Sequence, residues 1–401
     1  MIGIFARCIP GYHPEGPGYR ITGKIQQATG PITVADILYA RSLAGDAEVK
    51  GILTGPTTMA LFLGLFGLMA YERPLPLGPS ASLLLAGVAG TWLQNVLRIT
   101  ALMVAGYHGG AESLWVTHGG GRDSFVVLSA YAQATRMIGL GNGVVPIYPR
   151  HPVALAQEAL TLAELSGGRF RLGIGVSHRS TMTDALGLEM GNPIQAMSEY
   201  LAVLRRALAG QVEHVGARYR VNWKSAVPKL PAPPPVLLAG LSVRMLELAG
   251  ETADGVILWL CAPEYIRKTA LPAVSRGRAR VGKTLEGFEV VAAVPVAVTQ
   301  DVAGTTALFK EELVRYLMLP FYRAMLVASG FSEELAAFDR ARSGRSVPDR
   351  LAQALGGIGD RAVVREYVAA YRRAGVTLPA VRPIGFPEAP HYRPTLEALV
   401  S

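Results

Sequence analysis

Two histidines stand at the ends of apolar segments and are candidates for acid–base chemistry. His118 closes the segment 113–118, and His178 follows the segment 170–176 after a single serine. An imidazole can accept or release a proton near neutral pH because its ordinary pKa lies in that range. If both segments are parallel strands, their carboxyl ends meet at one end of the fold. We therefore predict His118 and His178 as catalytic residues at a shared site.

A second candidate is an anion site at Ala239, Gly240, Leu241 and Ser242, which lie between an apolar segment and a helical one. The free N–H groups and the dipole at a helix N-terminus attract phosphate. Gly240 would permit close approach of the phosphate, and the Ser242 hydroxyl could add a hydrogen bond. The alternative interpretation is that Ser242 only caps the helix.

The elements that would position these residues are clearest between Arg150 and Arg179. An apolar stripe at helical spacing covers residues 154–165 and ends at two glycines, which favour a helix C-terminus. Residues 170–176 are apolar and follow at once, as in a strand buried on both faces.

The same alternation of strand and helix continues from residue 112 to the C-terminus and favours a parallel α/β architecture. A long helical stretch, 305–342, is expected between the seventh strand and the helical region 348–374. The expected strands are 113–118, 138–145, 170–176, 236–240, 255–260, 289–299 and 378–384, with helices at 125–135, 193–209 and 246–253.

Two segments resemble the luciferase-like monooxygenase superfamily: RHPVALAQEALTLAELSGGRFRLGIGVSHR, starting at Arg150, and PPVLLAGLSVRMLELAGETADGVILW, at 234–259. The resemblance covers about residues 112–401. It implies a TIM (β/α)8 barrel with a helical insertion after strand seven, and an oxidoreductase that uses FMN or the deazaflavin coenzyme F-420. The SHR ending of strand four and the helices after strand seven look more like the deazaflavin branch, so F-420 is favoured and FMN is the alternative.

The resemblance also implies roles for individual residues. Gly173, Gly175, Val176 and Ser177 would border the cofactor tail, and Ala239–Ser242 would hold its phosphate. A non-prolyl cis peptide at Gly143–Val144 would lie behind the cofactor ring.

Two positions depart from the related deazaflavin enzymes at the expected ring site. Thr117 stands where relatives often have Asp, and His178 stands where they can have Glu. No metal ligands are predicted.

Residues 1–110 are predicted as a separate, atypical and apolar segment before a barrel domain at 111–401. Residues 11–60 resemble cobalamin-independent methionine synthase, and residues 61–110 resemble exosortase, without the zinc ligands or nucleophile of those families. In one interpretation, Val49–Leu53 and Ser82–Tyr107 form the first strand and helix of the barrel. In another, residues 60–107 form a membrane hairpin, and the alternative function is then a membrane-associated or composite protein with an incomplete, inactive barrel.

Composition sets the remaining limits. The chain has 401 residues, a net charge of +9 and two cysteines, Cys8 and Cys261, which fit a reducing compartment and a cytoplasmic location. The sequence lacks motifs of nucleic-acid binding, so we predict no nucleic-acid partner. The expected partner is a small organic substrate undergoing hydride transfer or monooxygenation, with a homodimer left open. The basic charge would suit the acidic tail of F-420.

Overall fold

The computed structural model describes residues 12–15, 18–21, 112–118, 121–227, 230–385 and 389–400. The chain divides into two compact units, Met1–Gln94 and Asn95–Ser401. In the first unit, β1 (Tyr12–Glu15) and β2 (Gly18–Ile21) form an antiparallel hairpin.

The second unit contains a nearly closed barrel of parallel strands. Hydrogen-bonded neighbours run in the order β12–β11–β10–β9–β6–β4–β3, with β13 paired to β11 and β5 paired to β6. The predicted α/β barrel class and the seven predicted strands from residue 113 onward are confirmed. These strands are β3 (Ser113–Val116), β4 (Gly139–Asn142), β6 (Phe170–Gly175), β9 (Val236–Ala239), β10 (Gly255–Trp259), β11 (Glu289–Val298) and β13 (Leu378–Pro383), with short additions at β5 (Val145–Pro146) and β12 (Gly357–Gly359).

In the described ranges, β13 and β3 are not hydrogen-bonded to each other, and no other strand joins them. The two strands nevertheless have residues close to each other. The predicted first strand Val49–Leu53, the predicted helix Ser82–Tyr107 and the alternative membrane hairpin 60–107 lie outside the described residues. Within the described ranges, none of the helices combines the length and the apolar character needed to cross a bilayer.

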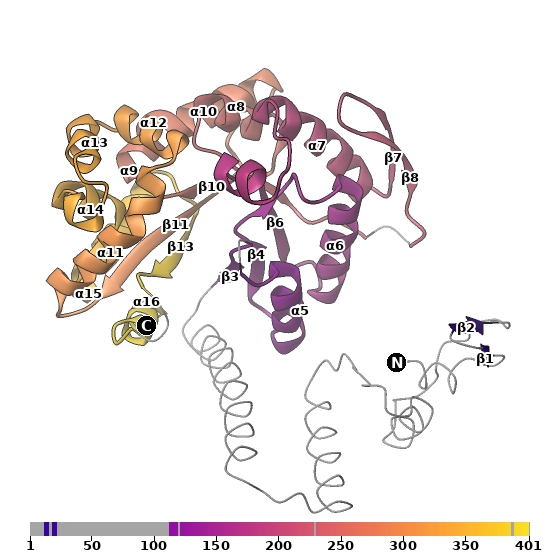
Figure 1. Cartoon of the computed structure of the whole chain (residues 1–401), viewed down its shortest axis with the longest axis horizontal. Coiled ribbons are helices and arrows are strands. Elements are labelled where there is room, and N and C mark those ends of the chain that lie inside the picture. The colour runs from indigo at the N-terminus through magenta and orange to yellow at the C-terminus, as the bar shows by residue number, and fades with distance from the viewer. Residues whose placement is uncertain are drawn as a thin grey trace, which may run out of the picture. The chain divides into compact units, whose positions relative to one another are not determined.

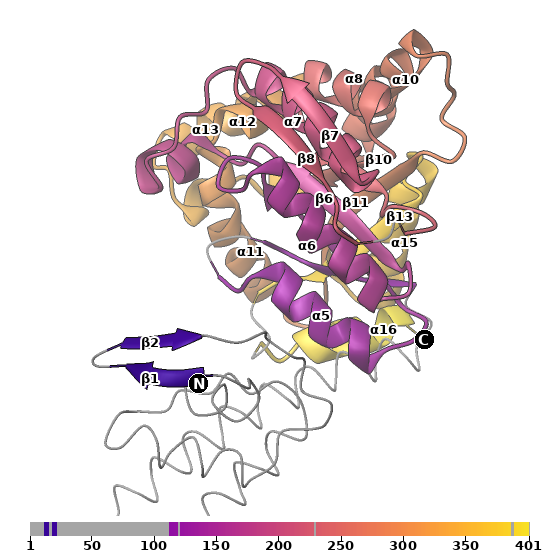
Figure 2. The ribbon, with the colours of Figure 1, turned by 90° about the vertical axis from the view of Figure 1, so that its right-hand side faces the viewer.

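Helices cover the outside of the barrel (Figures 1 and 2). Asp123 caps the first of them, α5, because its carboxylate accepts the Phe125 N–H at 2.8 Å. His151 caps α6 in the same way through the Val153 N–H. These helices are α5 (Ser124–Ala134), α6 (Pro152–Leu165), α7 (Pro193–Leu208), α8 (Val243–Thr252), α9 (Pro263–Tyr265), α10 (Leu271–Arg280), α15 (Arg361–Arg373) and α16 (Tyr392–Val400), with short helical turns η1 (Ser180–Ala185) and η2 (Ile266–Ala270). The hairpin of β7 (Gln211–Val215) and β8 (Arg220–Lys224) follows α7.

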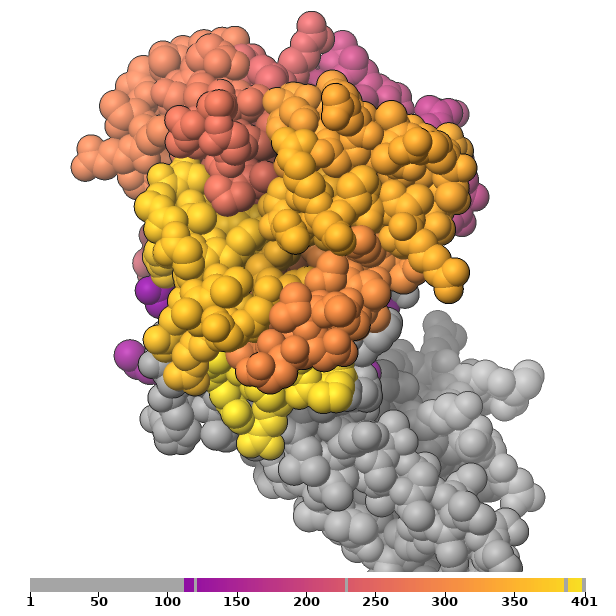
Figure 3. Space-filling view, turned by 90° about the vertical axis from the view of Figure 1, so that its left-hand side faces the viewer, coloured from indigo at the N-terminus to yellow at the C-terminus, as the bar shows by residue number. Residues whose placement is uncertain are grey.

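The predicted continuous helical stretch 305–342 is wrong in detail, because the structure breaks it into three helices. Pro320 has no N–H to continue the preceding helix, and Gly330 has a φ of +82°. The insertion contains α11 (Val302–Leu317), α12 (Pro320–Ala328), α13 (Ser332–Asp339), the turn η3 (Gly344–Ser346) and α14 (Asp349–Leu355). Figure 3 shows the orange atoms of this insertion grouped on one face beside the yellow atoms of the C-terminal segments.

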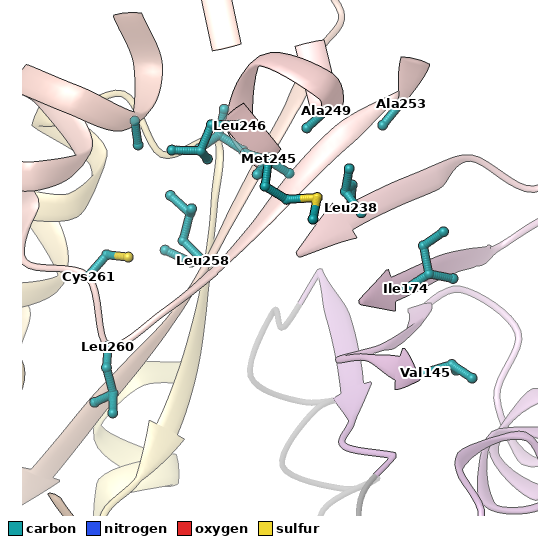
Figure 4. Packing of buried hydrophobic residues seen from close by; sticks show 14 of the residues in the cluster. Val145, Ile174, Leu238, Met245, Leu246, Ala249, Ala253, Leu258, Leu260 and Cys261 are labelled. Atoms are coloured by element: carbon teal, nitrogen blue, oxygen red, sulfur yellow. The ribbon is translucent and has the colours of Figure 1, made fainter. Parts of the chain in front are cut away.

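Buried aliphatic side chains hold α8 against the sheet. Met245 and Leu246 on α8 and Leu238 on β9 are all at most 4% exposed, and Figure 4 shows them packed near one another. On its other side, α8 packs closely against α10, where Gly250 and Gly277 each lie next to a carbonyl of the opposite helix. The N-terminus of α8 is therefore fixed from both sides.

Candidate active site

One cavity of about 1140 Å³ joins the carboxyl ends of the barrel strands. Its volume is somewhat above the usual range for small-molecule sites. It also reaches the amino ends of the strands at Glu112, Ile138 and Leu378. Eleven of the twelve predicted site residues line it: His118, Gly143, Val144, Gly175, Val176, Ser177, His178, Ala239, Gly240, Leu241 and Ser242.

Gly173 is the predicted site residue that is not among the lining residues. A Cβ at this position would lie 2.1 Å from the Asn142 carbonyl oxygen and 2.6 Å from the Ile257 side chain. Gly173 therefore allows β6 to approach β4 and the barrel interior closely, which is a packing role.

The N-terminus of α8 presents polar groups to the cavity. The Ser242 Oγ accepts the Met245 N–H at 3.3 Å, and the Ser242 carbonyl accepts the Leu246 N–H at 3.0 Å. Ser242 is therefore a helix cap, but its own O–H is still available to a ligand. The N–H groups of Val243 and Arg244 have no acceptor in the described part of the chain. Together these donors form an anion site of the kind that binds phosphate.

Arg244 adds a positive charge to this site, although it was not among the predicted site residues. It is the second residue of α8, it is exposed and it lines the cavity. Arg244 could have been predicted, since it stands two residues after Ser242 in the sequence. A cation beside a helix N-terminus strengthens anion binding.

The floor of the cavity is apolar. Leu237, Ile257 and Val291 form a small buried cluster inside the barrel, and Trp115 and Val144 pack on it. The structure has the cis Gly143–Val144 peptide that the resemblance implied. The Gly143 N–H donates to the Val116 carbonyl at 2.9 Å, which holds this peptide beside β3. The apolar surface of this floor, with Trp115 and Val144 on it, suits the face of a planar ring.

Both ring nitrogens of His118 contact other protein groups. Arg150 Nη1 lies 2.9 Å from Nε2, and Ser124 Oγ lies 2.9 Å from Nδ1. A guanidinium can only donate, so the Arg150 contact places a donor against Nε2. The Ser124 N–H donates to Nδ1 at 3.3 Å. Both ring nitrogens are therefore engaged by neighbouring protein groups.

Burial and the neighbouring Arg150 favour the neutral form of His118. Burial lowers its pKa, Arg150 lowers it further, and Asp123 opposes both effects. Arg150 is held in turn by Asp123 at 2.7 Å and by Glu158 at 3.2 Å. Arg150 was missed as a site residue because no local pattern connects it to a histidine 32 positions earlier.

His178 has a different environment. Burial lowers the pKa of its imidazole, and its ring packs on Tyr322 with the ring centres 5.8 Å apart. In the described ranges no side chain or backbone group forms a hydrogen bond with its ring nitrogens. His178 is thus the histidine of the cavity that is free to exchange a proton with a bound molecule.

Aromatic side chains extend from His178 along one wall. Tyr322 contacts Tyr316 at 5.1 Å between ring centres, and Tyr316 contacts Trp259 at 5.8 Å. The two tyrosines come from α11 and α12 of the insertion. They were missed because the sequence placed only an undivided helical stretch there, with no indication that it returns to the strand ends. We call Tyr316, Tyr322 and Trp259 the aromatic wall.

The protein-family comparison decides the class. The model of the luciferase-like monooxygenase family matches residues 81–378, about three quarters of the chain. The chain belongs to the luciferase-like monooxygenase family. The match starts before residue 112 and so extends into the N-terminal segment.

One relative and two solved structures are similar to this chain. A Mycobacterium tuberculosis protein named as a candidate coenzyme F-420-dependent oxidoreductase is 28% identical over 314 residues, which cover 70% of this chain and 89% of that protein. The F-420-dependent tetrahydromethanopterin reductase structure from Methanopyrus kandleri aligns with a TM-score of 0.65 at 23% identity, covering 76% of this chain and 93% of the other. A type II Baeyer–Villiger monooxygenase of Pseudomonas putida, solved with FMN, aligns with a TM-score of 0.56 at 16% identity, covering 75% and 89%. The two structures establish the fold, and the family establishes the class of oxidoreductase.

Proposed function

We propose that this protein binds the deazaflavin coenzyme F-420 in its barrel cavity and catalyses hydride transfer to or from a small organic substrate. The observation that carries the proposal is that the α8 N-terminus, the apolar floor and the free His178 line a single cavity. These three features match the needs of a phosphate-bearing planar cofactor and a reaction that moves a proton.

The residues present fit such a cofactor. The free N–H groups of Val243 and Arg244, with the Ser242 hydroxyl, would hold its phosphate. Trp115 and Val144 on the apolar floor would support one face of its ring. When bound, the deazaflavin supplies hydride chemistry.

His178 would act on the substrate, and His118 would position the site. Because both His118 nitrogens are used by Ser124 and Arg150, that ring has no free atom for a substrate. His178 has free nitrogens and a pKa lowered by burial, so it would be neutral at pH 7 and would accept a proton.

F-420 is preferred over FMN for two reasons. The M. tuberculosis relative is named for F-420. Arg244 and the net charge of +9 also suit a cofactor with an acidic tail. The structural neighbour with FMN keeps that cofactor as the alternative.

The test is a fluorescence titration of the purified protein with F-420 and, separately, with FMN. Gly240→Asp and Gly240→Asn form a matched pair, because both add a similar side chain against Met245 and only Asp adds a charge. We expect tight F-420 binding by the wild type and at least about tenfold weaker binding by the Asp variant than by the Asn variant.

Equal affinities of the two variants would reject the phosphate site at α8. If folded wild-type protein binds neither cofactor, the proposal fails and the inactive-barrel alternative is favoured.

A further inference from the structure

We propose that the cavity accepts a substrate with a planar apolar body and a carboxylate, and that Arg315 binds that carboxylate. This inference rests on the proposed function, because the carboxylate would be held beside the same wall that carries His178. It concerns the aromatic wall of the cavity rather than the phosphate site at α8.

Arg315 is a positioned cation at the cavity surface. Its guanidinium carbon lies 4.7 Å from the centre of the Tyr316 ring, and its Nη2 donates to the Tyr316 hydroxyl at 2.9 Å. A guanidinium has five N–H donors, and this is the one hydrogen bond that it forms in the described ranges. None of the described carboxylates pairs with it.

The other arginines that line the cavity either have an acidic partner or lie away from the aromatic wall. Arg382 is paired with Glu312 at 2.6 Å and lies over Trp259. Arg244 belongs to the N-terminus of α8. Arg372 is in the last turn of α15, which leads to the amino end of β13. Arg315 is therefore the cavity arginine beside the aromatic wall that has no acidic partner in the described part of the chain.

The cavity favours an anion overall. Its described lining has four arginines and one acidic residue, Glu112, which lies at the amino ends of the strands. Arginine stays charged at any physiological pH, so a neutral ligand that covered Arg315 would remove water from an unpaired charge. A carboxylate avoids this cost and can take two parallel hydrogen bonds from the guanidinium.

The aromatic wall defines the rest of the ligand. The rings form a continuous series from His178 through Tyr322 and Tyr316 to Trp259. Arg315 lies over the middle ring of the wall, that of Tyr316. Aromatic faces and edges pack well on a planar apolar molecule. A planar acid could contact this wall while its carboxylate reaches Arg315 and its reactive group lies near His178.

The test uses isothermal titration calorimetry of the full chain with 2-naphthoate and with 2-naphthamide. The two probes share the ring system and differ in charge. We expect wild-type protein to bind the acid at least about tenfold more tightly than the amide. Arg315→Gln should remove this preference for the acid and leave amide binding unchanged. Arg315→Lys should retain part of the preference, because lysine keeps the positive charge but lacks the planar guanidinium. Arg345→Gln, an exposed arginine of the same insertion, is the matched control and should match the wild type.

Three results would overturn the inference: no preference for the acid in the wild type, absence of binding by both probes, or equal loss of both probes in Arg315→Gln. The third result would mean that Arg315 only supports Tyr316. A fourth result, in which Arg315→Gln weakens F-420 binding but leaves 2-naphthoate binding unchanged, would assign the arginine to the cofactor tail and also overturn it.

The failures of the two proposals can be separated. Cofactor binding that depends on Gly240, without acid preference, would leave the proposed function intact and reject the carboxylate site. Acid preference that depends on Arg315, without binding of either cofactor, would support the anion site and reject the proposed function.

Discussion

At the scale of single residues, His118 and His178 differ in what their nitrogens contact. Both end up in the cavity, as their positions after apolar segments predicted. His118 is fixed between Ser124 and Arg150, whereas the ring of His178 contacts Tyr322 and has no hydrogen bond in the described ranges. The direct proton-transfer role therefore belongs to His178 in the function that we propose.

Replacing Arg150 with Gln should raise the pKa of His118. Burial is the main cause of its lowered pKa, and the positive charge of Arg150 is the next. The substitution removes that charge and leaves Asp123, which acts in the raising direction. The pKa is measured by following the imidazole signals with NMR between pH 5 and 8, a range around the ordinary histidine value.

The matched control for this titration is Arg220→Gln on β8. Arg220 is exposed, and the variant removes the same charge at a position away from the cavity lining. It should leave the His118 titration unchanged. An unchanged or lower His118 pKa in Arg150→Gln would show that the Arg150 contact does not act on this imidazole.

At the scale of elements, close packing of α8 against α10 fixes the anion site. A Cβ on Gly277 would lie 2.0 Å from the Glu247 carbonyl oxygen, and one on Gly250 would lie 2.2 Å from the Val274 carbonyl oxygen. These atoms belong to helix backbones, which cannot move aside without separating the helices. The glycines therefore set the distance between the helices.

Gly277→Ala should lower the free energy of unfolding by about 1–2 kcal/mol, because forcing extra volume into a packed interface usually costs about 1–3 kcal/mol. This cost exceeds the gain of at most about 1 kcal/mol from the better helix propensity of alanine. Urea unfolding followed by circular dichroism measures the change.

Gly121→Ala is the control, because a Cβ there has nothing within 4 Å. Its unfolding free energy should stay within about 0.5 kcal/mol of the wild type. If Gly277→Ala is as stable as Gly121→Ala, the α8–α10 interface is looser than the structure indicates.

At the scale of the whole molecule, the strands were predictable and the cavity wall was not. Segments such as Phe170–Gly175 are apolar, short and bounded by glycines, so their sequence alone indicates buried parallel strands. The positions of Tyr316 and Tyr322 depend on how α11 and α12 turn at Pro320 and pack back on Trp259. That is a tertiary relation between segments far apart in the sequence, and helix periodicity has no information about it.

The same limit explains two individual residues. Arg150 reaches His118 only because α5 and α6 lie side by side on the barrel. Gly173 resembles a cofactor-contacting glycine in sequence, but the close carbonyl of Asn142 gives it a packing role. The resemblance placed Gly173 on the correct strand. It could not indicate whether this position faces the cavity or a neighbouring strand.

Burial of His178 should also make the stability of the whole protein depend on pH. Its pKa is below the ordinary value of 6.5 in the folded state, so the unfolded chain binds more protons as the pH falls through about 6.5. The free energy of unfolding should therefore be fully maintained above 6.5 and decrease as the pH falls toward the folded pKa. Urea unfolding at pH 7.5 and 5.5 should show a smaller decrease for His178→Gln than for the wild type.

Glu158, whose pKa is raised chiefly by burial, acts in the opposite direction but is present in both proteins and cancels in the comparison. An equal decrease in the two proteins would mean that His178 is as well hydrated in the folded state as in the unfolded chain, and His178 would then lose its place as the neutral proton acceptor of the cavity.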